Sequence, residues 1–249
     1  MKSILAPQSR PVLRALARGR VLLAFDFDGT LAPIVAVPAR AHLRPRTREL
    51  LANVARKYPC VVISGRRRAD VVARLHGISL RRVFGNHGIE PSSALPAARC
   101  AVQGWLARLT PRLAHVAGMI FDNKGASLAI HYRKARDRRA ALQTILTATA
   151  DLTDARILNG LLVVDLLPIG APNKATALQS ELRRLRCRAA LYLGDDQTDE
   201  DVFALSRTLP LLAVRVGRKP HSLAPYYLAS QHHVDMLLAA LLELRSQPG

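Results

Sequence analysis

Short apolar runs alternate with stretches of helical periodicity in the first and last thirds of the chain. Four apolar runs predict buried strands at Val21–Phe25, Cys60–Ile63, Ala189–Leu193 and Leu211–Val216. Helical patterns occur at Pro45–Tyr58, Ala69–Leu75, Ala175–Leu185 and Asp199–Ser206. Strands that alternate with helices are typical of a parallel sheet covered on both faces. The pattern therefore predicts an α/β fold with a Rossmann-like parallel sheet.

The middle of the chain, residues 90–171, has a different pattern. Its expected elements are a half-exposed strand at Ser127–Arg133, a helix at Asp137–Thr149, and strands at Arg156–Leu158 and Leu161–Leu166. The turn pair Asn159-Gly160 is expected to join the last two strands. Strands with one polar face and a hairpin turn predict a small α+β domain inserted into the parallel-sheet core.

Composition narrows the class of protein. The chain has 249 residues, of which 49% are hydrophobic, so a large buried core is expected. Its cysteines, Cys60, Cys100 and Cys187, are far apart and indicate neither a disulfide framework nor a zinc site. We find no signal-peptide pattern and no apolar stretch of membrane-spanning length, so a cytoplasmic protein is expected.

The net charge of +19 has three interpretations. It could attract nucleic acid or a membrane surface, it could be scattered over solvated helices, or it could draw in a small anionic substrate. The arginines are spread along the chain without an aromatic-rich basic strip. We therefore expect a scattered basic surface, with neither nucleic acid nor membrane as a partner. The sequence does not reveal the oligomeric state, for which a monomer is the favoured expectation.

Acidic residues gather in two short segments. Asp26 and Asp28 directly follow the first predicted strand, and Gly29 next to them permits an unusual backbone turn. The segment 194–201 holds five of the chain's 18 acids, with Asp195 directly after a predicted strand. Clustered carboxylates repel one another unless a cation or a proton is shared, and Mg²⁺ prefers such oxygen ligands. A divalent cation site is therefore expected, with an Asp-Gly turn and a helix N-terminus as the structural alternatives.

Two further segments follow predicted strands or open helices. Ser64 ends the second apolar run, where its hydroxyl could hold a phosphate or cap the next helix. Lys174 opens a helical pattern, where its charge opposes the helix dipole. It could neutralise a phosphoryl oxygen or remain a solvated surface residue. Active sites of parallel sheets lie at the carboxyl ends of strands, which is where Asp26, Ser64 and Asp195 are expected.

Together, these segments resemble the motifs of the haloacid dehalogenase superfamily, in the same order. Three finer segments are similar to trehalose-6-phosphate phosphatases: Gly85-Asn86-His87-Gly88-Ile89-Glu90, the run from Ser127 to Arg133, and the run from Gly194 to Phe203. The resemblance implies a catalytic core at residues 1–89 and 172–249, and an inserted cap at 90–171 that recognises the sugar. It also implies hydrolysis of trehalose 6-phosphate to trehalose and phosphate.

Spacing and resemblance together assign roles. Asp26 is the expected nucleophile, forming a phosphoryl-aspartate, and Asp28 the expected general acid and base. Ser64 and Lys174 are expected to bind phosphoryl oxygens. The expected Mg²⁺ ligands are Asp26, the backbone carbonyl of Asp28 and Asp195, with Asp196 or Asp199 behind them. The further candidates for substrate contact are Gly29, Thr30, Gly65, Arg66, Asn86, His87, Glu90, His131, Arg133 and Asp165.

One segment departs from the family pattern and keeps alternatives open. The family has Glu-x-Arg/Lys-Pro in the cap, whereas this chain has Asp165-Leu166-Leu167-Pro168, so Leu167 replaces the expected cation. Another sugar phosphate, such as a sucrose phosphate, remains an alternative substrate, and a mutase would need a second phosphate site. A non-catalytic, basic nucleic-acid-binding protein is the alternative from a different class.

Overall fold

The computed structural model describes residues 1–35 and 37–247. The chain divides into two compact units. The core unit comprises Met1–Gly88 and Asn173–Gly249, and the inserted unit comprises Ile89–Pro172. The two units are described separately below.

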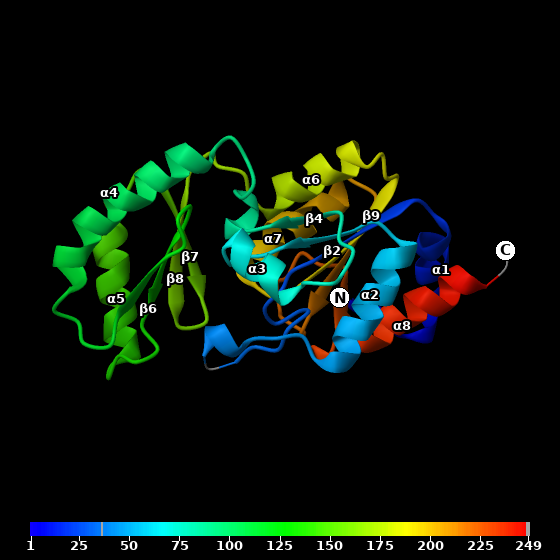
Figure 1. The fold of residues 1–249 in the computed structure, drawn as a ribbon. Coiled ribbons are helices and arrows are strands. Elements are labelled where there is room, and N and C mark those ends of the chain that lie inside the picture. The colour runs from blue at the N-terminus through cyan, green and yellow to red at the C-terminus, as the bar shows by residue number, and fades with distance from the viewer. Residues whose placement is uncertain (36, 248–249) are drawn as a thin grey trace. The chain divides into compact units, whose positions relative to one another are not determined.

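The core unit is built on a seven-stranded sheet in which every neighbouring pair is parallel (Figure 1). In spatial order the strands are β1 (Lys2–Ser3), β11 (Tyr226–Leu228), β10 (Leu211–Val216), β9 (Ala189–Gly194), β2 (Val21–Phe25), β3 (Cys60–Ile63) and β4 (Arg82–Phe84). The predicted α/β class with a parallel sheet is thus confirmed. Because β2, β3 and β9 are neighbours, their carboxyl ends meet at one edge of the sheet.

Helices cover both faces of this sheet. One face carries α1 (Arg10–Arg18), α2 (Pro45–Lys57), α3 (Arg68–Arg74) and α8 (His232–Ser246). The other face carries α6 (Lys174–Arg184) and α7 (Glu200–Ala204). Short 3-10 turns join elements of the unit: η1 (Pro7–Ser9), η2 (Pro38–Arg40), η3 (Asn86–Gly88), η4 (Gln197–Asp199) and η5 (Leu205–Arg207). Among the described residues, no helix combines the length and apolar character needed to cross a membrane.

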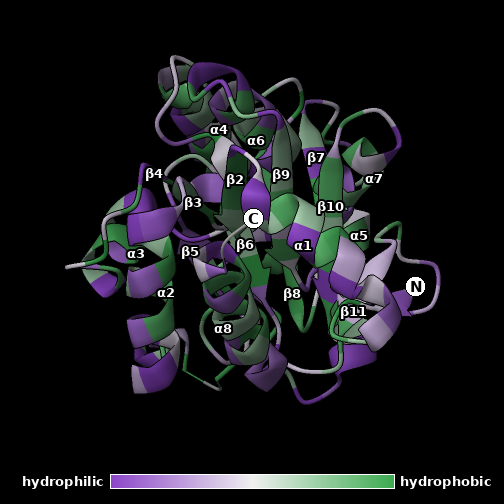
Figure 2. Cartoon of the chain, turned by 90° about the vertical axis from the view of Figure 1, so that its right-hand side faces the viewer, coloured by the Kyte–Doolittle hydropathy of each residue, from purple (hydrophilic) through white to green (hydrophobic). Residues whose placement is uncertain are grey.

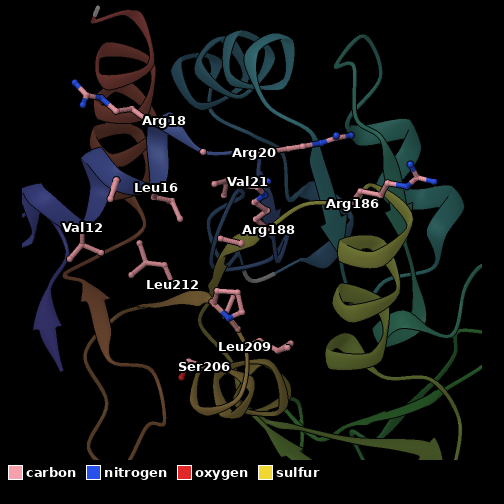
Figure 3. A pocket seen from close by; sticks show the side chains of 15 residues that line it. Val12, Leu16, Arg18, Arg20, Val21, Arg186, Arg188, Ser206, Leu209 and Leu212 are labelled. Carbon is pink, nitrogen blue, oxygen red and sulfur yellow. The ribbon is translucent and has the colours of Figure 1, made fainter. Parts of the chain in front are cut away.

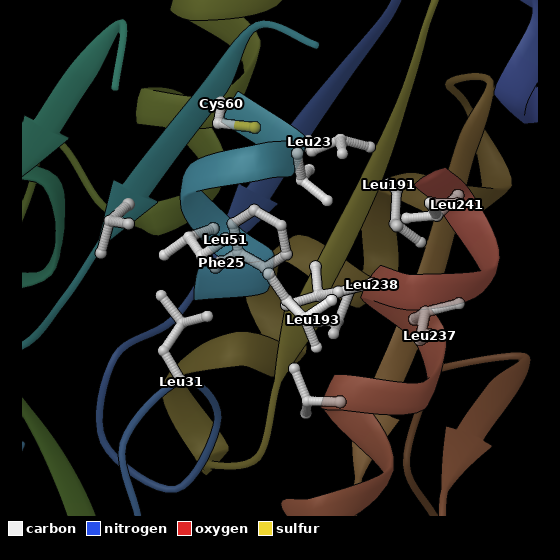
Figure 4. Close-up of a cluster of buried hydrophobic side chains, with 14 of the residues drawn as sticks. Leu23, Phe25, Leu31, Leu51, Cys60, Leu191, Leu193, Leu237, Leu238 and Leu241 are labelled. Atoms are coloured by element: carbon white, nitrogen blue, oxygen red, sulfur yellow. The ribbon is translucent and has the colours of Figure 1, made fainter. Parts of the chain in front are cut away.

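The coverage of both faces explains why the strand sequences are continuously apolar. All five residues of β2 are buried. Leu23 and Phe25 pack with side chains of α2, α8 and β9, as Figure 4 shows, whereas Leu22 and Ala24 pack against the opposite helices. Figure 2 shows the same division, with hydrophobic colour along β2 and β10 and mixed colour on α2 and α3.

The inserted unit has an antiparallel sheet with two helices on one face (Figure 1). Its strands, in spatial order, are β5 (Ile120–Asn123), β6 (Leu128–His131), β8 (Val163–Pro168) and β7 (Ala155–Gly160), and its helices are α4 (Leu95–Leu113) and α5 (Arg138–Thr149). Trp105 of α4, Ile145 of α5 and Leu166 of β8 belong to one buried cluster. Trp105 also donates from its indole nitrogen to Asp154 at 3.0 Å, which satisfies its buried polar group.

The hairpin turn of this unit lies two residues beyond the predicted one. Asn159 and Gly160 belong to β7, and Gly160 pairs with Val163. The turn is therefore Leu161-Leu162, with Leu162 at φ 60°. Leu162 packs against the buried cluster, and its carbonyl accepts from the Tyr132 amide at 3.2 Å. These tertiary contacts set the register against the local preference of Asn-Gly for a turn.

Candidate active site at the carboxyl edge of the parallel sheet

Asp26 lies at the centre of the carboxyl edge of the sheet. It follows β2 directly, and its amide donates to the Leu193 carbonyl of β9 at 2.8 Å, which extends the parallel ladder. Its side chain is buried, with 4% exposure. Burial raises the pKa of Asp26, and the Lys174 charge opposes this effect. A buried carboxylate of this kind needs a cation nearby.

Lys174 provides one such cation. Asn173 caps α6 through a capping box with Thr176, which places Lys174 in the first turn. The Lys174 ammonium is buried and lies 2.8 Å from Asp26 Oδ1 and 2.8 Å from Asp199 Oδ1. Burial opposes its charge, but Asp199 and Asp26 together raise the pKa of Lys174, so it is a cation at neutral pH. The solvated alternative for Lys174 is thus excluded.

Both carboxylate oxygens of Asp199, which lies close to Asp26, accept hydrogen bonds. It is fully buried, and its Oδ2 accepts from the amides of Asp195 and Asp196, each at 2.9 Å. Its Oδ1 accepts from Lys174 and, at 2.6 Å, from the Tyr192 hydroxyl. Both oxygens of Asp199 are therefore used, and this residue fixes the loop that follows β9.

The loop after β2 brings Thr30 and Gly29 against Asp195. Thr30 Oγ1 donates to Asp195 Oδ1 at 3.0 Å. Gly29 has φ 79°, and a Cβ atom there would lie 2.0 Å from Asp195 Oδ2. Only glycine satisfies both the backbone and the space. The Gln231 amide donates to the carbonyls of Thr30 and Leu31, at 3.2 and 3.0 Å, and holds the loop in place.

The carboxylates of this site fit a divalent cation. Asp26, Asp195 and Asp199 each offer an oxygen within 4.8 Å of the others. Burial and the Asp199 charge raise the pKa of Asp195 to about 7, which reflects an excess of negative charge over the single Lys174 ammonium. Hard oxygen ligands with excess negative charge suit Mg²⁺. Since Asp199 is fully hydrogen-bonded, Asp26 and Asp195 are the carboxylates left to bind a cation directly.

Asp196 and the Asp28 side chain lie outside this group of three. The Asp196 carboxylate caps η4, where it accepts from the Asp199 amide. Both Asp28 oxygens accept from Arg66, at 2.6 Å from Nε and 2.7 Å from Nη2. The Asp28 side chain is 40% exposed, so it stands at the mouth of the site. Arg66 also contacts Asp70 of α3 at 2.9 Å and the Pro38 carbonyl at 2.8 Å, which fixes its guanidinium plane.

Ser64 ends β3 beside these groups. It is buried, and its Oγ accepts from the Arg66 amide at 3.2 Å. The helix α3 begins only at Arg68 and has no side-chain cap. The capping alternative for Ser64 is therefore wrong, because Gly65, Arg66 and Arg67 separate it from the first residue of the helix.

Asn86 and His87 lie against the Ser64 loop. The His87 amide donates to the Ser64 carbonyl at 2.9 Å, and the Asn86 amide donates to the Arg66 carbonyl at 2.7 Å. A Cβ atom at Gly65 would lie 2.6 Å from the His87 ring. Both residues have positive φ, 47° for Asn86 and 58° for His87, a conformation that Asn and His adopt more readily than most residues other than glycine.

Three residues of the site were missed at the level of sequence. They are Tyr192 of β9, Arg215 of β10 and Gln231 before α8. Arg215 is buried and donates to the carbonyls of Asp195 and Asp196 and, at 2.8 Å, to Glu200. Arg215 could have been recognised in the sequence, because it is a charged residue inside an apolar strand. Tyr192 and Gln231 carry no comparable signal.

The inserted unit places two polar pairs on one face of its sheet. Asp165 of β8 accepts from the Lys124 ammonium, with 3.1 Å between Oδ1 and Nζ. His131 of β6 lies 3.9 Å from Asp122 of β5. The register puts His131 and Asp165 on the face opposite the helices, because Leu166 next to Asp165 belongs to the buried cluster.

Lys124 supplies the cation that the sequence pattern lacked at Leu167. The Leu167 side chain is buried, with 5% exposure. Lys124 belongs to the turn between β5 and β6 and could be matched to Asp165 only through the strand pairing. Of the two remaining candidates, Glu90 is the second residue of the inserted unit, and Arg133 lies exposed after β6.

Comparisons with known proteins agree with this arrangement. The family described as trehalose-phosphatase matches residues 24–232. The chain is 34% identical to the trehalose-phosphate phosphatase of Mycobacterium tuberculosis, over 72% of this chain and 49% of that protein. It is 26% identical to the trehalose 6-phosphate phosphatase RA3 of Zea mays, over 88% of this chain and 69% of that protein. The chain thus spans about half the length of the mycobacterial relative and over two thirds of the maize protein.

A solved structure shares the fold. The C-terminal domain of the trehalose-6-phosphate phosphatase of C. albicans superposes with a TM-score of 0.72 at 20% identity, covering 94% of this chain and 96% of that domain. The family match covers the carboxyl-edge loops after β2, β3 and β9 and the whole inserted unit. The chain therefore belongs to the trehalose-phosphatase family.

Proposed function

We propose that this chain hydrolyses trehalose 6-phosphate to trehalose and phosphate through a phosphoryl-aspartate on Asp26. The observation that carries the proposal is the buried Asp26 carboxylate, held by Lys174 at 2.8 Å beside Asp195 and Asp199. The curated relatives support the substrate, since the mycobacterial and maize proteins are both named for it. Residues 89–172 act in this proposal as a cap that recognises the sugar.

In the first step an oxygen of Asp26 attacks phosphorus. The new Asp26–phosphorus bond forms as the bond between phosphorus and the sugar oxygen breaks. Asp28 gives its proton to the leaving sugar oxygen, which departs as a hydroxyl. Lys174 uses two of its three N–H groups on Asp26 and Asp199, so the third is left for a phosphoryl oxygen. Ser64 is the second phosphoryl contact.

In the second step water cleaves the phosphoryl-aspartate. Asp28, now ionised, takes a proton from the water as its oxygen bonds to phosphorus, and Asp26 leaves as a carboxylate. Arg66 orients Asp28 through two hydrogen bonds, at 2.6 and 2.7 Å. Asp26, Asp195 and the Asp28 carbonyl would hold Mg²⁺, with Asp199 behind them. When bound, the metal supplies positive charge that offsets the phosphate and aligns it for attack.

In the inserted unit, the Asp165–Lys124 pair is the proposed contact for sugar hydroxyls. A carboxylate and an ammonium 3.1 Å apart offer an acceptor and donors to adjacent hydroxyl groups. His131, on the same sheet face, adds a further polar group. Gly29, Thr30, Gly65, Asn86 and His87 shape the phosphate end of the site, while Glu90 and Arg133 remain proposed sugar contacts.

Phosphate release from a panel of sugar phosphates tests the proposal. We expect trehalose 6-phosphate to exceed sucrose 6-phosphate and glucose 6-phosphate in kcat/KM, and we expect no release in the presence of a chelator of divalent cations. Asp26→Asn should lower kcat by more than about 10³-fold, a barrier increase of over ~4 kcal/mol, while the circular dichroism spectrum stays unchanged. Full activity in chelator would contradict the proposed metal. Activity of Asp26→Asn within about tenfold of wild type would contradict the proposed role of Asp26 as nucleophile.

A further inference from the structure

A depression of about 980 Å³ lies at the amino edge of the parallel sheet, opposite the edge that carries Asp26. It is formed by the end of α1, the starts of β2, β9 and β10, and the loops that lead into these strands. Figure 3 shows Leu16, Val21 and Leu212 near its middle. No residue of the proposed hydrolytic site lines it.

Among the described residues that line this depression, four are arginines and none is acidic. The arginines are Arg18, Arg20, Arg186 and Arg188, and all four are exposed. In Figure 3 Arg18 lies on one side of the apolar middle, and Arg20 and Arg186 lie on the other. Within residues 1–35 and 37–247, none of these four guanidinium groups forms an ion pair with a carboxylate.

Two of these arginines stand opposite each other, each directly before one of two neighbouring strands. The pairing of β2 with β9 puts Val21 beside Ala189, so Arg20 faces Arg188. The Arg188 amide donates to the Arg20 carbonyl at 3.0 Å, which confirms the register. Two positive side chains that start from paired backbone positions repel each other. A bound anion would remove this repulsion.

The helix dipole explains the positions of only two of the four arginines. Arg18 is the last residue of α1 and Arg186 follows the end of α6, where positive charge is favourable. Arg20 and Arg188 instead precede strands directly, so this preference does not explain them. Their shared feature is the depression that they line.

The floor is apolar. Val21, Leu211 and Leu212 line the depression and are buried, with exposures of 2%, 7% and 8%. Among the described residues that line the depression there is no aromatic side chain that could stack on successive bases. The volume of about 980 Å³ is within the range of small-molecule sites.

We propose that this depression is a second binding site, for a small organic diphosphate. Guanidinium forks match phosphate oxygens, so Arg20 and Arg188 would bind the diphosphate, with Arg18 and Arg186 adding charge from either side. The apolar floor would take the organic part of the ligand. The site is independent of the proposed hydrolysis, because it uses the opposite edge of the sheet.

Binding of ADP, measured by isothermal titration calorimetry on the full chain, tests this proposal. We expect Arg20→Gln/Arg188→Gln to weaken ADP binding at least about tenfold. The matched control is Arg14→Gln/Arg183→Gln, which changes two exposed arginines of α1 and α6 outside the depression and lowers the net charge equally. The control should bind ADP as the wild type does, and pyrophosphate should bind the wild type at least about fivefold more weakly than ADP because it lacks an organic part.

Three outcomes would overturn the proposal. They are the absence of ADP binding, equal weakening by both double variants, and equal affinity for ADP and pyrophosphate. Retention of duplex DNA that depends on Arg20 and Arg188, without ADP binding, would assign the surface to nucleic acid instead. Phosphate release by Arg20→Gln/Arg188→Gln is expected to equal that of wild type, which separates this site from the hydrolytic one.

Discussion

Lys174 shows how one buried charge organises the site at the scale of residues. Its ammonium lies 2.8 Å from each of two carboxylates, and one of these, Asp199, also receives the Tyr192 hydroxyl and two amides. Removal of the cation would leave Asp26, Asp195 and Asp199 with no ammonium among them. A lone Lys at the start of a helix predicts none of this, because its partners come from the ends of two other elements.

Lys174→Met should therefore destabilise the fold as well as stop turnover. Because breaking a buried ion pair leaves uncompensated charge, we expect a loss of about 3–5 kcal/mol in the free energy of unfolding without divalent metal. Urea unfolding followed by circular dichroism measures it, and Lys219→Met, at an exposed position, is the control. A change below about 1 kcal/mol would contradict the structural role of Lys174.

The raised pKa of Asp195 predicts a pH dependence of stability. In the fold this pKa is about 7, against 3.8 ordinarily, so between these values the folded state holds a proton that the unfolded state has released. Stability of the metal-free chain should fall as pH rises from about 4 to about 7, by up to ~1.4 kcal/mol per pH unit. Urea midpoints at a series of pH values measure this slope.

Asp195→Asn is the companion variant for that series. Because an amide does not titrate, the slope between pH 4 and 7 should become shallower than in wild type. Added Mg²⁺ should flatten it in wild type as well, since a bound cation favours the ionised carboxylate. Identical slopes of stability against pH in wild type and Asp195→Asn would contradict the prediction.

At the scale of elements, strand pairing decides which side chains of the inserted unit meet. Lys124 lies in the β5–β6 turn and Asp165 in β8, 41 residues later, yet they form an ion pair of 3.1 Å. The motif pattern placed the cation at position 167, where Leu167 is buried instead. The same rule governs the β7–β8 hairpin, whose register follows Leu162 packing rather than the Asn159-Gly160 pair.

Lys124→Met should raise KM for trehalose 6-phosphate by at least about tenfold, since a charged hydrogen-bond donor to the sugar would be lost. Turnover of p-nitrophenyl phosphate, which has no sugar, should change by less than about twofold. Steady-state kinetics on both substrates check this, with Lys134→Met as the exposed control. Equal losses on both substrates would contradict a role in sugar recognition.

At the scale of the whole molecule, 37 basic residues exceed 18 acidic ones. Part of the acidic set is committed to the carboxyl edge, where Asp26, Asp195 and Asp199 gather. Arginines without acidic partners gather around the depression at the amino edge. Because the strands of the sheet are parallel, these two groups lie at its opposite edges.

The net charge of +19 should also speed capture of an anionic substrate. We expect kcat/KM for trehalose 6-phosphate to fall severalfold between 50 and 300 mM NaCl, with kcat nearly unchanged, because salt screens long-range attraction. Initial rates at limiting substrate measure this, with a neutral osmolyte at equal osmolality as control. A constant kcat/KM across the salt series would show that the charge does not assist capture.

The sequence alone determined the strands β2, β3, β9 and β10, and the positions of Asp26, Ser64 and Asp195 directly after three of them. These features are readable because a strand buried on both faces is a continuous apolar run, and the site residues follow it immediately. The trehalose-phosphatase family was readable for the same reason, since its motifs are short and local.

Only the tertiary structure decided which distant groups meet. Three sets of contacts join residues from different elements. They are the two hydrogen bonds from Arg66 to Asp28, the contacts of Tyr192 and Arg215 with the acidic loop after β9, and the Lys124–Asp165 ion pair. Strand order and register bring them together, and neither is encoded in local periodicity. The charge pattern of a single segment therefore could not reveal these partners, whereas the packed sheets could.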